Sequence, residues 1–358
     1  MNKKTPHKIL IAIFPLIFQN FSSVHFFSVI IPVYNRPEEV AELLKSLELQ
    51  AYRHFEILIV EDGSELSAEA VVASFAERLP IAYYQKPNSG PGDSRNFGAQ
   101  RAKGDFFIFL DSDCLVPEGY FEALNSYLEQ HPDTEAFGGP DRAHENFTDI
   151  QKAINYAMTS RLTTGGIRGS KHYQSAKFHP RSFNMGLSRA VFEYTQGFGK
   201  MRFGEDIDLS LRIQAGGFAT ALIPDAFVYH KRRTDFRKFF KQIYNSGIAR
   251  INLYKLHPTS LKAIHFLPFI FVVSFIFWFL AGLLLQAPGW WLAVPLGALV
   301  VFFDALLFYR YTPKVAALSV LATVVQLGAY GLGFGQALWR RVLLQKASFQ
   351  AFEKNFYK

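Results

Sequence analysis

Three long apolar stretches in the C-terminal third of this 358-residue chain constrain its fold more than any other feature. They cover Ile264–Gln286, Trp290–Tyr309 and Val315–Trp339, contain no Lys, Arg or Glu, and include one acidic residue, Asp304. A helix needs about 20 apolar residues to cross a bilayer. We therefore expect about three transmembrane helices within residues 263–339 rather than buried core helices.

The positive charge of the chain is concentrated directly before these stretches. The formal net charge is +8, and residues 231–262 alone contain nine Lys or Arg and one Asp, which leaves the rest neutral. A basic segment beside a membrane anchor favours the membrane surface over nucleic acid as the partner. We predict that residues 234–262 form a basic amphipathic segment in the membrane interface. The chain is then a multi-pass inner-membrane protein whose preceding domain faces the cytoplasm.

The two ends of the chain complicate this topology. Three crossings place the basic tail, residues 340–358, outside, although Arg340 and Arg341 then oppose the positive-inside tendency. Closely spaced glycines in the third apolar stretch indicate close helix packing or a re-entrant path. At the other end, residues 1–25 form a short apolar segment without a clear signal-peptide cleavage site.

Between these ends, residues 26–233 alternate strand-like runs with helices. The strand-like runs are Ser28–Val33, Glu56–Val60, Ile81–Gln85 and Phe106–Leu110. Amphipathic helices are expected at Pro37–Leu49, Ser67–Arg78 and Pro91–Ala102, and from Pro117 onward. This alternation predicts a parallel α/β sheet. Ligands of such sheets bind beyond the carboxyl ends of the strands, so we expect the functional site there.

Polar residues follow each predicted strand at that edge. The fourth strand leads into Asp111-Ser112-Asp113. Two carboxylates in this spacing present oxygens to Mg²⁺ or Mn²⁺, hard cations that prefer oxygen ligands and bridge diphosphates. An isolated pair of this kind is more often a solvated turn, but the other polar strand ends favour a metal site. His230, at the end of another strand-like run, is either structural or completes that site.

Two further segments contain charged residues with open interpretations. A Gly/Pro-rich loop at residues 88–92 precedes a helix whose free N–H groups suit an anion, and Arg95 either adds charge there or belongs to a plain helix entry. Glu205 and Asp206 stand in the first turn of a later helix. The helix dipole alone favours acidic residues there, but a carboxylate facing the metal also suits a general base.

Six motifs in these segments point jointly to one protein family. They are Phe27–Asn35, Val60–Ser64, Ser94–Gly98, Phe109–Asp113, Asn184–Gly186 and Gly204–Asp208. In this order, over about 180 residues, they resemble the family 2 glycosyltransferases. The resemblance implies a Rossmann-like nucleotide-sugar-binding domain with the A-type glycosyltransferase (GT-A) fold and a mostly parallel α/β sheet, followed here by a transmembrane α-helical region. It also implies inverting transfer from a nucleotide-diphosphate sugar, with Mg²⁺ or Mn²⁺ as cofactor.

The resemblance assigns donor binding to seven residues: Pro32, Val33, Asn35, Asp62, Arg95, Asp111 and Ser112. Among them, Asp62 would hold the nucleobase, and Asp111 would contact the ribose or the sugar. The aligned roles in metal binding and catalysis fall on four more residues: Asp113 as the metal ligand, His230 as a further ligand, Asp206 as the base and Glu205 beside it.

One departure from the family concerns processive members, which carry a Gln-x-x-Arg-Trp motif before their membrane helices. Here the corresponding segment reads Gln242-Ile243-Tyr244-Asn245-Ser246 and lacks both Arg and Trp. The departure favours a single transfer over chain building. A glycine-rich basic loop, residues 161–180, is predicted either to close over the donor or to be merely solvated.

The sequence thus predicts an enzyme that glycosylates a lipid-linked or glycan acceptor in cell-surface polysaccharide or glycolipid synthesis, with no nucleic-acid partner. One alternative makes a polyprenyl-phosphate sugar, for which the ionised lipid phosphate needs no base. Another is a nucleotidyltransferase, which would release pyrophosphate. An inactive sugar-nucleotide sensor is disfavoured by the intact set of Asp62, Asp113 and Asp206.

Overall fold

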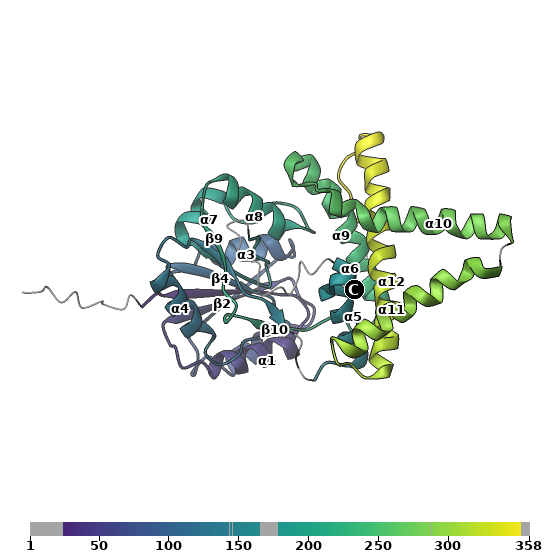
Figure 1. Ribbon diagram of the computed structural model, residues 1–358. Coiled ribbons are helices and arrows are strands. Elements are labelled where there is room, and N and C mark those ends of the chain that lie inside the picture. Colours follow the sequence, from purple (N-terminus) through teal and green to yellow (C-terminus); the bar gives the residue numbers. More distant parts are fainter. Residues whose placement is uncertain (1–23, 143, 145, 165–177, 287, 352–358) are drawn as a thin grey trace, which may run out of the picture.

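The computed structural model describes residues 24–142, 144, 146–164, 178–286 and 288–351. An α/β domain lies beside a helical region, and two helices of that region project away from the domain (Figure 1). The predicted N-terminal apolar segment, 1–25, and the predicted closing loop, 161–180, lie largely outside the described residues.

A seven-stranded sheet with the order β3-β2-β1-β4-β8-β6-β9 forms the centre of the α/β domain. Its strands are β1 (Phe27–Val33), β2 (Phe55–Asp62), β3 (Ile81–Lys86), β4 (Phe106–Leu110), β6 (Ala136–Gly138), β8 (Asn184–Ser188) and β9 (Thr220–Leu222). The first four strands along the chain pair in parallel, whereas β8 is antiparallel to both β4 and β6. The predicted α/β fold with a mostly parallel sheet is confirmed.

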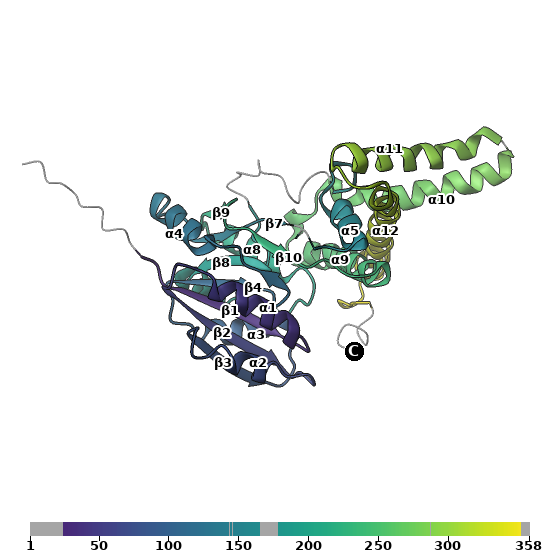
Figure 2. The ribbon, with the colours of Figure 1, turned by 90° about the horizontal axis from the view of Figure 1, so that it is seen from below.

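Helices cover both faces of this sheet (Figures 1 and 2). They are α1 (Pro37–Glu48), α2 (Glu69–Ala73), α3 (Pro91–Ala99), α4 (Tyr120–Gln130), α7 (Arg189–Thr195) and α8 (Glu205–Ala215). The α1 helix begins at a proline and buries apolar side chains at helical spacing, which is why it packs on one face. The second helix is shorter than predicted because the chain turns near Ser74, whose hydroxyl bonds to the carbonyl oxygen of Val71 at 2.7 Å.

A second, three-stranded sheet lies at the edge where the functional site was expected. It contains β5 (Cys114–Leu115), β10 (Val228–His230) and β7 (Asp141–Arg142), in the order β5-β10-β7. In the antiparallel β5–β10 pair, His230 stands opposite Cys114. This register brings His230 next to Asp113, although 117 positions separate them in sequence.

The helical region consists of segments from two parts of the chain. It contains α5 (Asp149–Thr159), α6 (Arg161–Thr164), α9 (Phe236–Leu256), α10 (Leu267–Leu285), α11 (Ala293–Leu307) and α12 (Pro313–Ala337), which ends in a π-helical turn (Leu338–Leu343). Short 3₁₀ turns, η1 (Pro258–Ser260), η2 (Ala263–Phe266) and η3 (Pro288–Leu292), connect these helices. Three helices are apolar and long enough to cross a membrane: Ala263–Leu285, Trp290–Leu307 and Pro313–Leu343.

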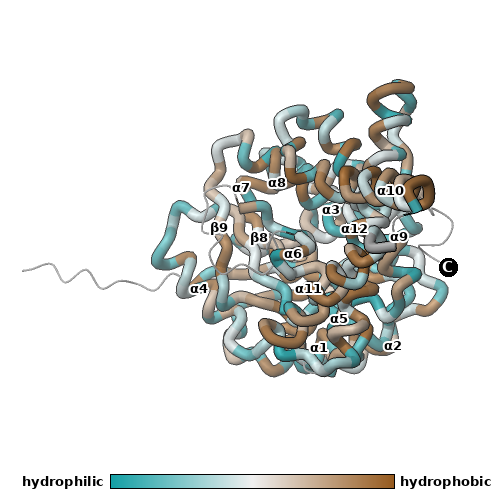
Figure 3. Tube along the Cα trace, turned by 45° about the vertical axis from the view of Figure 1, so that its right-hand side comes forward, coloured by the Kyte–Doolittle hydropathy of each residue, from teal (hydrophilic) through white to brown (hydrophobic). Residues whose placement is uncertain are grey.

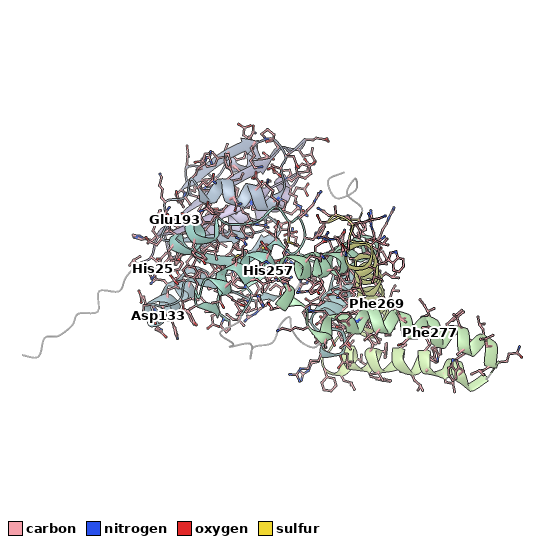
Figure 4. The ribbon with its side chains drawn as sticks, turned by 90° about the horizontal axis from the view of Figure 1, so that it is seen from above. His25, Asp133, Glu193, His257, Phe269 and Phe277 are labelled. Carbon is pink, nitrogen blue, oxygen red and sulfur yellow. The ribbon has the colours of Figure 1, made fainter. Side chains whose placement is uncertain are left out.

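These three helices do not form a parallel bundle. The α10–α11 hairpin projects outward, whereas α12 runs crosswise to it and is seen almost end-on in Figure 2. Only 6% of each hairpin span is buried, against 39% for α12. Phe277, far out on the hairpin, is 69% exposed, whereas Phe269 packs against Phe334 of α12 (Figure 4). The apolar surface is therefore concentrated on the hairpin, as the colours of α10 in Figure 3 indicate.

The apolar face of α9 packs against other helices of the same chain. Phe239 and Ile243 pack with α5 and α12, and Ile248 and Ile251 pack with the end of α12. All four side chains are at most 3% exposed. The predicted placement of residues 234–262 in the membrane interface requires these apolar side chains to contact lipid. That placement stays a prediction, and the four side chains named here are already buried against other helices.

Close approach of α9 and α12 depends on glycine. A Cβ atom added at Gly333 would lie 2.1 Å from the carbonyl oxygen of Tyr244, and one added at Gly247 would lie 2.3 Å from that of Tyr330. At Gly328, also in α12, an added Cβ meets nothing within 4 Å. The closely spaced glycines predicted to mediate packing thus do so at Gly333 but not at Gly328.

We expect Gly333→Ala to lower the melting temperature of the detergent-solubilised protein, because two backbones must separate to admit the methyl group. Overpacking of this kind costs roughly 1–3 kcal/mol. The matched control, Gly328→Ala, is expected to be neutral or slightly stabilising, since Ala favours the helix. Equal melting temperatures for the two variants would contradict the α9–α12 packing.

Candidate functional site

A cavity of about 680 Å³ opens at the carboxyl ends of β1 and β4. The first turn of α8 and the polar side of α9 form its other walls. Nine of the eleven predicted site residues line it: Pro32, Asn35, Arg95, Asp111, Ser112, Asp113, Glu205, Asp206 and His230. Val33 and Asp62 are not among the lining residues; the Val33 side chain belongs to the hydrophobic core and is 1% exposed.

Asp113 lies at the centre of the charged part of the cavity. Its Oδ1 is 3.1 Å from Nε2 of His230, and Arg36 donates a hydrogen bond to its Oδ2. Burial alone would raise the pKa of the Asp113 carboxyl. The positive charges of His230, Arg36 and Arg233 outweigh burial and hold this pKa well below its usual range, so the carboxylate is ionised.

The donor set around Asp113 fits a hard divalent cation. The buried Oδ1 of Asp113 faces Nε2 of His230 and has no further hydrogen-bond partner among the described residues, so a lone pair is available. Asp111 Oδ2 lies 3.9 Å from Nε2 of His230 and adds a second carboxylate. Cys114 is also close, but burial raises the pKa of its thiol well above the usual range. A neutral thiol is a poor ligand for Mg²⁺ or Mn²⁺, so Asp113 and His230, with Asp111 beside them, are the residues that could hold such an ion.

Arg95 is held by two carboxylates of the protein. Its guanidinium donates to Asp111 at 2.6 Å and to Glu205, and the residue is 3% exposed. It thereby links α3 to the end of β4 and to the start of α8. This geometry favours a role in positioning Asp111 over a direct contact with the donor phosphates.

Asp62 likewise stabilises a loop. Its carboxylate accepts from the backbone N–H groups of Ser89 at 2.9 Å and Gly90 at 2.8 Å, and pairs with Lys86 at 2.5 Å. These bonds fix the Gly/Pro-rich loop that precedes α3. A smaller cavity of about 250 Å³ borders Lys86 and Ser64. The backbone N–H of Asn35, which lines the larger cavity, donates at 2.9 Å to the hydroxyl of Ser64, which lines the smaller one.

The two candidate bases have different surroundings. Asp206 is directed at the cavity, where its Oδ2 accepts from Nε of Arg181 at 2.8 Å. Glu205 accepts a hydrogen bond from Arg95 and packs against α3. A Cβ atom added at Gly92 of α3 would lie 2.9 Å from Oε2 of Glu205. Burial raises the pKa of Glu205 to about 7. A pKa near neutrality suits a base, but geometry comes first: both carboxylates line the cavity, and Glu205 is occupied by the buried Arg95, which favours Asp206.

The helix that bears Asp206 is also tied to the helical region. Asp208 accepts from Arg212 at 2.9 Å and lies 2.7 Å from Nε2 of His257, at the end of α9. Figure 4 shows His257 at the junction between the α/β domain and the projecting helices. The orientation of α8 therefore depends on α9.

Several cavity residues were not predicted from the sequence. Arg36, Arg181 and Arg233 line the cavity, and the ring of Phe183 stacks on His230 with centroids 4.9 Å apart. Arg36 directly follows the first strand, which is a signal that could have been used. Arg233 belongs to the basic run that was assigned to the membrane surface, and no periodicity marks Arg181 or Phe183.

Comparison with known proteins agrees with this architecture. Residues 28–195 match the model of the family described as glycosyl transferase family 2. An uncharacterized glycosyltransferase of Haemophilus influenzae is 37% identical over 132 residues, which cover 36% of this chain and 44% of that protein. The minor teichoic acid biosynthesis protein GgaB of Bacillus subtilis is 34% identical over 109 residues, which cover 29% of this chain and 12% of that protein.

Among solved structures, the mannosyltransferase PcManGT from Pyrobaculum calidifontis, in complex with GDP-Man and Mn²⁺, is similar in fold. The TM-score is 0.60 at 16% identity, and the match covers 85% of this chain and 87% of that one. The chain spans less than half the length of the two curated relatives described above. Motifs, sheet topology and these matches agree that residues 28–195 form a glycosyl transferase family 2 domain with the GT-A fold, which three long apolar helices follow in the described part of the chain.

Proposed function

We propose that this chain is an inverting, metal-dependent glycosyltransferase that moves a sugar from a nucleotide-diphosphate donor to a hydroxyl of a lipid-linked acceptor. One observation carries the proposal: a metal-type donor set and the Asp206 carboxylate line the same cavity, which α9 connects to the apolar helices. The catalytic domain would comprise residues 26–233, and the relative in teichoic acid biosynthesis is consistent with a cell-surface product.

On the donor side, Asp111, Asp113 and His230 would hold Mg²⁺ or Mn²⁺. The bound cation would neutralise charge on the departing nucleoside diphosphate. Arg233, whose charge acts on Asp113, lines the same cavity and would bind a diphosphate oxygen. The smaller cavity near Ser64 would receive the nucleoside, and Asp62 would shape it by fixing the loop at residues 88–92.

On the acceptor side, Asp206 would take the proton of the attacking hydroxyl. The hydroxyl oxygen forms a bond to the anomeric carbon while the bond from that carbon to the diphosphate oxygen breaks, and the electron pair leaves with the diphosphate. Attack from the face opposite the leaving group inverts the anomeric centre. Arg181 would orient Asp206 through the 2.8 Å contact.

A donor panel tests this function directly. Membranes containing the full chain should release nucleoside diphosphate from one nucleotide sugar in the presence of Mn²⁺ and an acceptor lipid extract. Addition of EDTA should stop the release. Release of pyrophosphate would instead indicate a nucleotidyltransferase, and full activity in EDTA would contradict the metal site.

The arrangement of the apolar helices supports a topology of two crossings. The α10–α11 hairpin meets α12 near Gly331 at one arm and near Ala316 at the other. These two positions are about 22 Å apart along α12 at 1.5 Å per residue. The axis of α12 therefore runs across the base of the hairpin and not alongside its two arms. We propose that the hairpin crosses the bilayer and α12 lies along its surface. The tail with Arg340 and Arg341 then remains on the same side as the catalytic domain, as the positive-inside tendency requires.

Labelling with a membrane-impermeant maleimide distinguishes two crossings from three. In sealed vesicles, a Gln286→Cys variant at the hairpin tip should react only from the side opposite the catalytic domain. Lys346→Cys, beyond α12, should react from the same side as the catalytic domain. Labelling of Lys346→Cys from the opposite side would establish three crossings. The natural Cys114 is buried and should stay unlabelled in the folded protein.

A further inference from the structure

A cationic cluster lies beyond the cavity, at the base of the α10–α11 hairpin. We define this headgroup cluster as His179, Arg181, Arg250 and Lys262. The positive charges of the other three residues act on the His179 ring, and burial together with these charges lowers the pKa of His179 to about 4. Within the described part of the chain, no carboxylate lies within 4.0 Å of a charged nitrogen of Arg250 or Lys262. The cluster therefore has positive charge without a matching anion at two of its members.

An unsatisfied polar atom marks the same place. Nδ1 of His179 is buried and makes no hydrogen bond to any described residue. A buried polar group without a partner costs free energy, so such atoms commonly face a ligand or water. Arg250 shares a hydrogen bond with Tyr330, but neither it nor Lys262 has a carboxylate partner among the described residues. Together with these two cations, His179 indicates a site for an oxygen-rich anion.

The polar side of α9 connects the cavity to the cluster. Lys238, Gln242 and Ser246 line the cavity at intervals of four residues, and Arg250 lies one turn further on the neighbouring part of this face. Lys262 follows shortly after α9, and the exposed apolar helix α10 begins five residues later, at Leu267. The cluster thus separates the sugar-transfer cavity from the surface that suits lipid.

We propose that Arg181, Arg250 and Lys262 bind the phosphate of a lipid-linked acceptor, with His179 donating a hydrogen bond to it. This inference rests on the proposed function and adds the chemical class of the acceptor. An acceptor of this class has its lipid chain beside the hairpin, its phosphate in the headgroup cluster and its sugar in the cavity. Charge complementarity and the adjoining apolar surface together match no uncharged lipid.

The position of the cluster also identifies the attacking atom. Arg181 both lines the cavity and pairs with Asp206, whereas Arg250 and Lys262 are not among the described residues that line the cavity. In this proposal the phosphate lies outside the cavity, beside Arg181, and a hydroxyl of the sugar attached to it reaches Asp206. The phosphate then anchors the acceptor and is not the nucleophile.

Binding of a simple alkyl phosphate tests the proposal without requiring activity. The full chain in neutral detergent micelles is titrated with dodecyl phosphate, with dodecanol and with inorganic phosphate, and the melting temperature is followed. Dodecyl phosphate should stabilise the wild type, whereas dodecanol should not. In an Arg250→Gln/Lys262→Gln variant, the half-maximal concentration should rise at least about tenfold for each removed charge. The matched control, Lys255→Gln, lies on the exposed end of α9 and should titrate like the wild type.

Each outcome bears on the proposal. An equal effect of inorganic phosphate at matched concentration would show a free-anion site and overturn the lipid assignment. An unchanged titration of the double variant, or of Lys262→Gln alone if the double variant does not fold, would overturn it as well. Binding of Mn²⁺ and a nucleoside diphosphate is measured on the same sample. Nucleotide binding without alkyl phosphate binding refutes this inference alone, whereas loss of both counts against the proposed function.

Discussion

Replacing Asp113 by Asn is expected to reduce sugar transfer by at least roughly 10²–10³-fold, the typical effect of removing one preorganised group that stabilises developing charge. The amide keeps the shape of the side chain but removes the negative charge that Arg36 and His230 surround. The cation should then bind more weakly, and the leaving diphosphate should lose its counter-charge. Turnover at saturating donor and the Mn²⁺ concentration for half-maximal activity are the two measurements.

Asp133→Asn is the matched control for this prediction. Asp133 lies in an exposed turn after α4 and does not line the cavity; Figure 4 shows it at the end of the α/β domain away from His257. The same chemical change there should leave turnover and Mn²⁺ dependence as in the wild type. An Asp113→Asn variant with normal turnover would remove the metal site from the proposal.

Replacing Asp206 by Asn should lower kcat by roughly 10²–10⁴-fold, the usual contribution of a general base. Donor binding should stay within a few-fold, because Asp206 lies on the acceptor side and its loss acts mainly on the transition state. The residue is 9% exposed and retains one hydrogen bond as Asn, so the fold should be preserved. Single-turnover rates and the donor dissociation constant separate the two effects.

Glu205→Gln is the informative comparison for this base. Loss of its charge leaves the buried guanidinium of Arg95 with one carboxylate instead of two. We expect a lower melting temperature for Glu205→Gln than for Asp206→Asn, but a smaller loss of kcat. If Glu205→Gln were inactive and Asp206→Asn active, the two roles would be exchanged. If both variants turned over normally, the acceptor would ionise without help, and a lipid phosphate would be the nucleophile.

Local sequence patterns predicted the α/β domain well because each pattern acts over a few residues. Alternating apolar runs and proline-started helices indicated β1 to β4 and their helices with small errors at the ends. The rule that ligands bind beyond the carboxyl ends of parallel strands also placed Asn35, Asp111 and Asp113 correctly at one edge of the sheet. What these residues share is that their position follows from the strand that precedes them.

Contacts between distant segments were not predictable in the same way. The pairing of His230 with Asp113 depends on the short β5–β10 ladder, and that of Arg95 with Glu205 depends on the packing of α3 on α8. The packing of α12 crosswise to the α10–α11 hairpin was also not predicted, because apolar length alone does not show how a helix packs on its neighbours. The prediction of about three transmembrane helices stays a prediction. That α12 packs on α9 depends on the absence of side chains at Gly247 and Gly333.

The bond between Tyr156 and Asp304 has a consequence for which acceptors can be used. The buried Tyr156 hydroxyl of α5 donates to the Asp304 carboxylate of α11 at 2.6 Å, so this one acidic residue of the hairpin is satisfied only while the hairpin keeps its present orientation. Rotating the hairpin away from α5 would leave the Asp304 carboxylate without this partner in apolar surroundings, which costs free energy. With the hairpin crossing the bilayer as proposed, the catalytic centre would be held at one height above the bilayer. Acceptors should consequently be sorted by the length of the spacer between their lipid and their reactive hydroxyl, and a product lengthened by one sugar no longer fits that height.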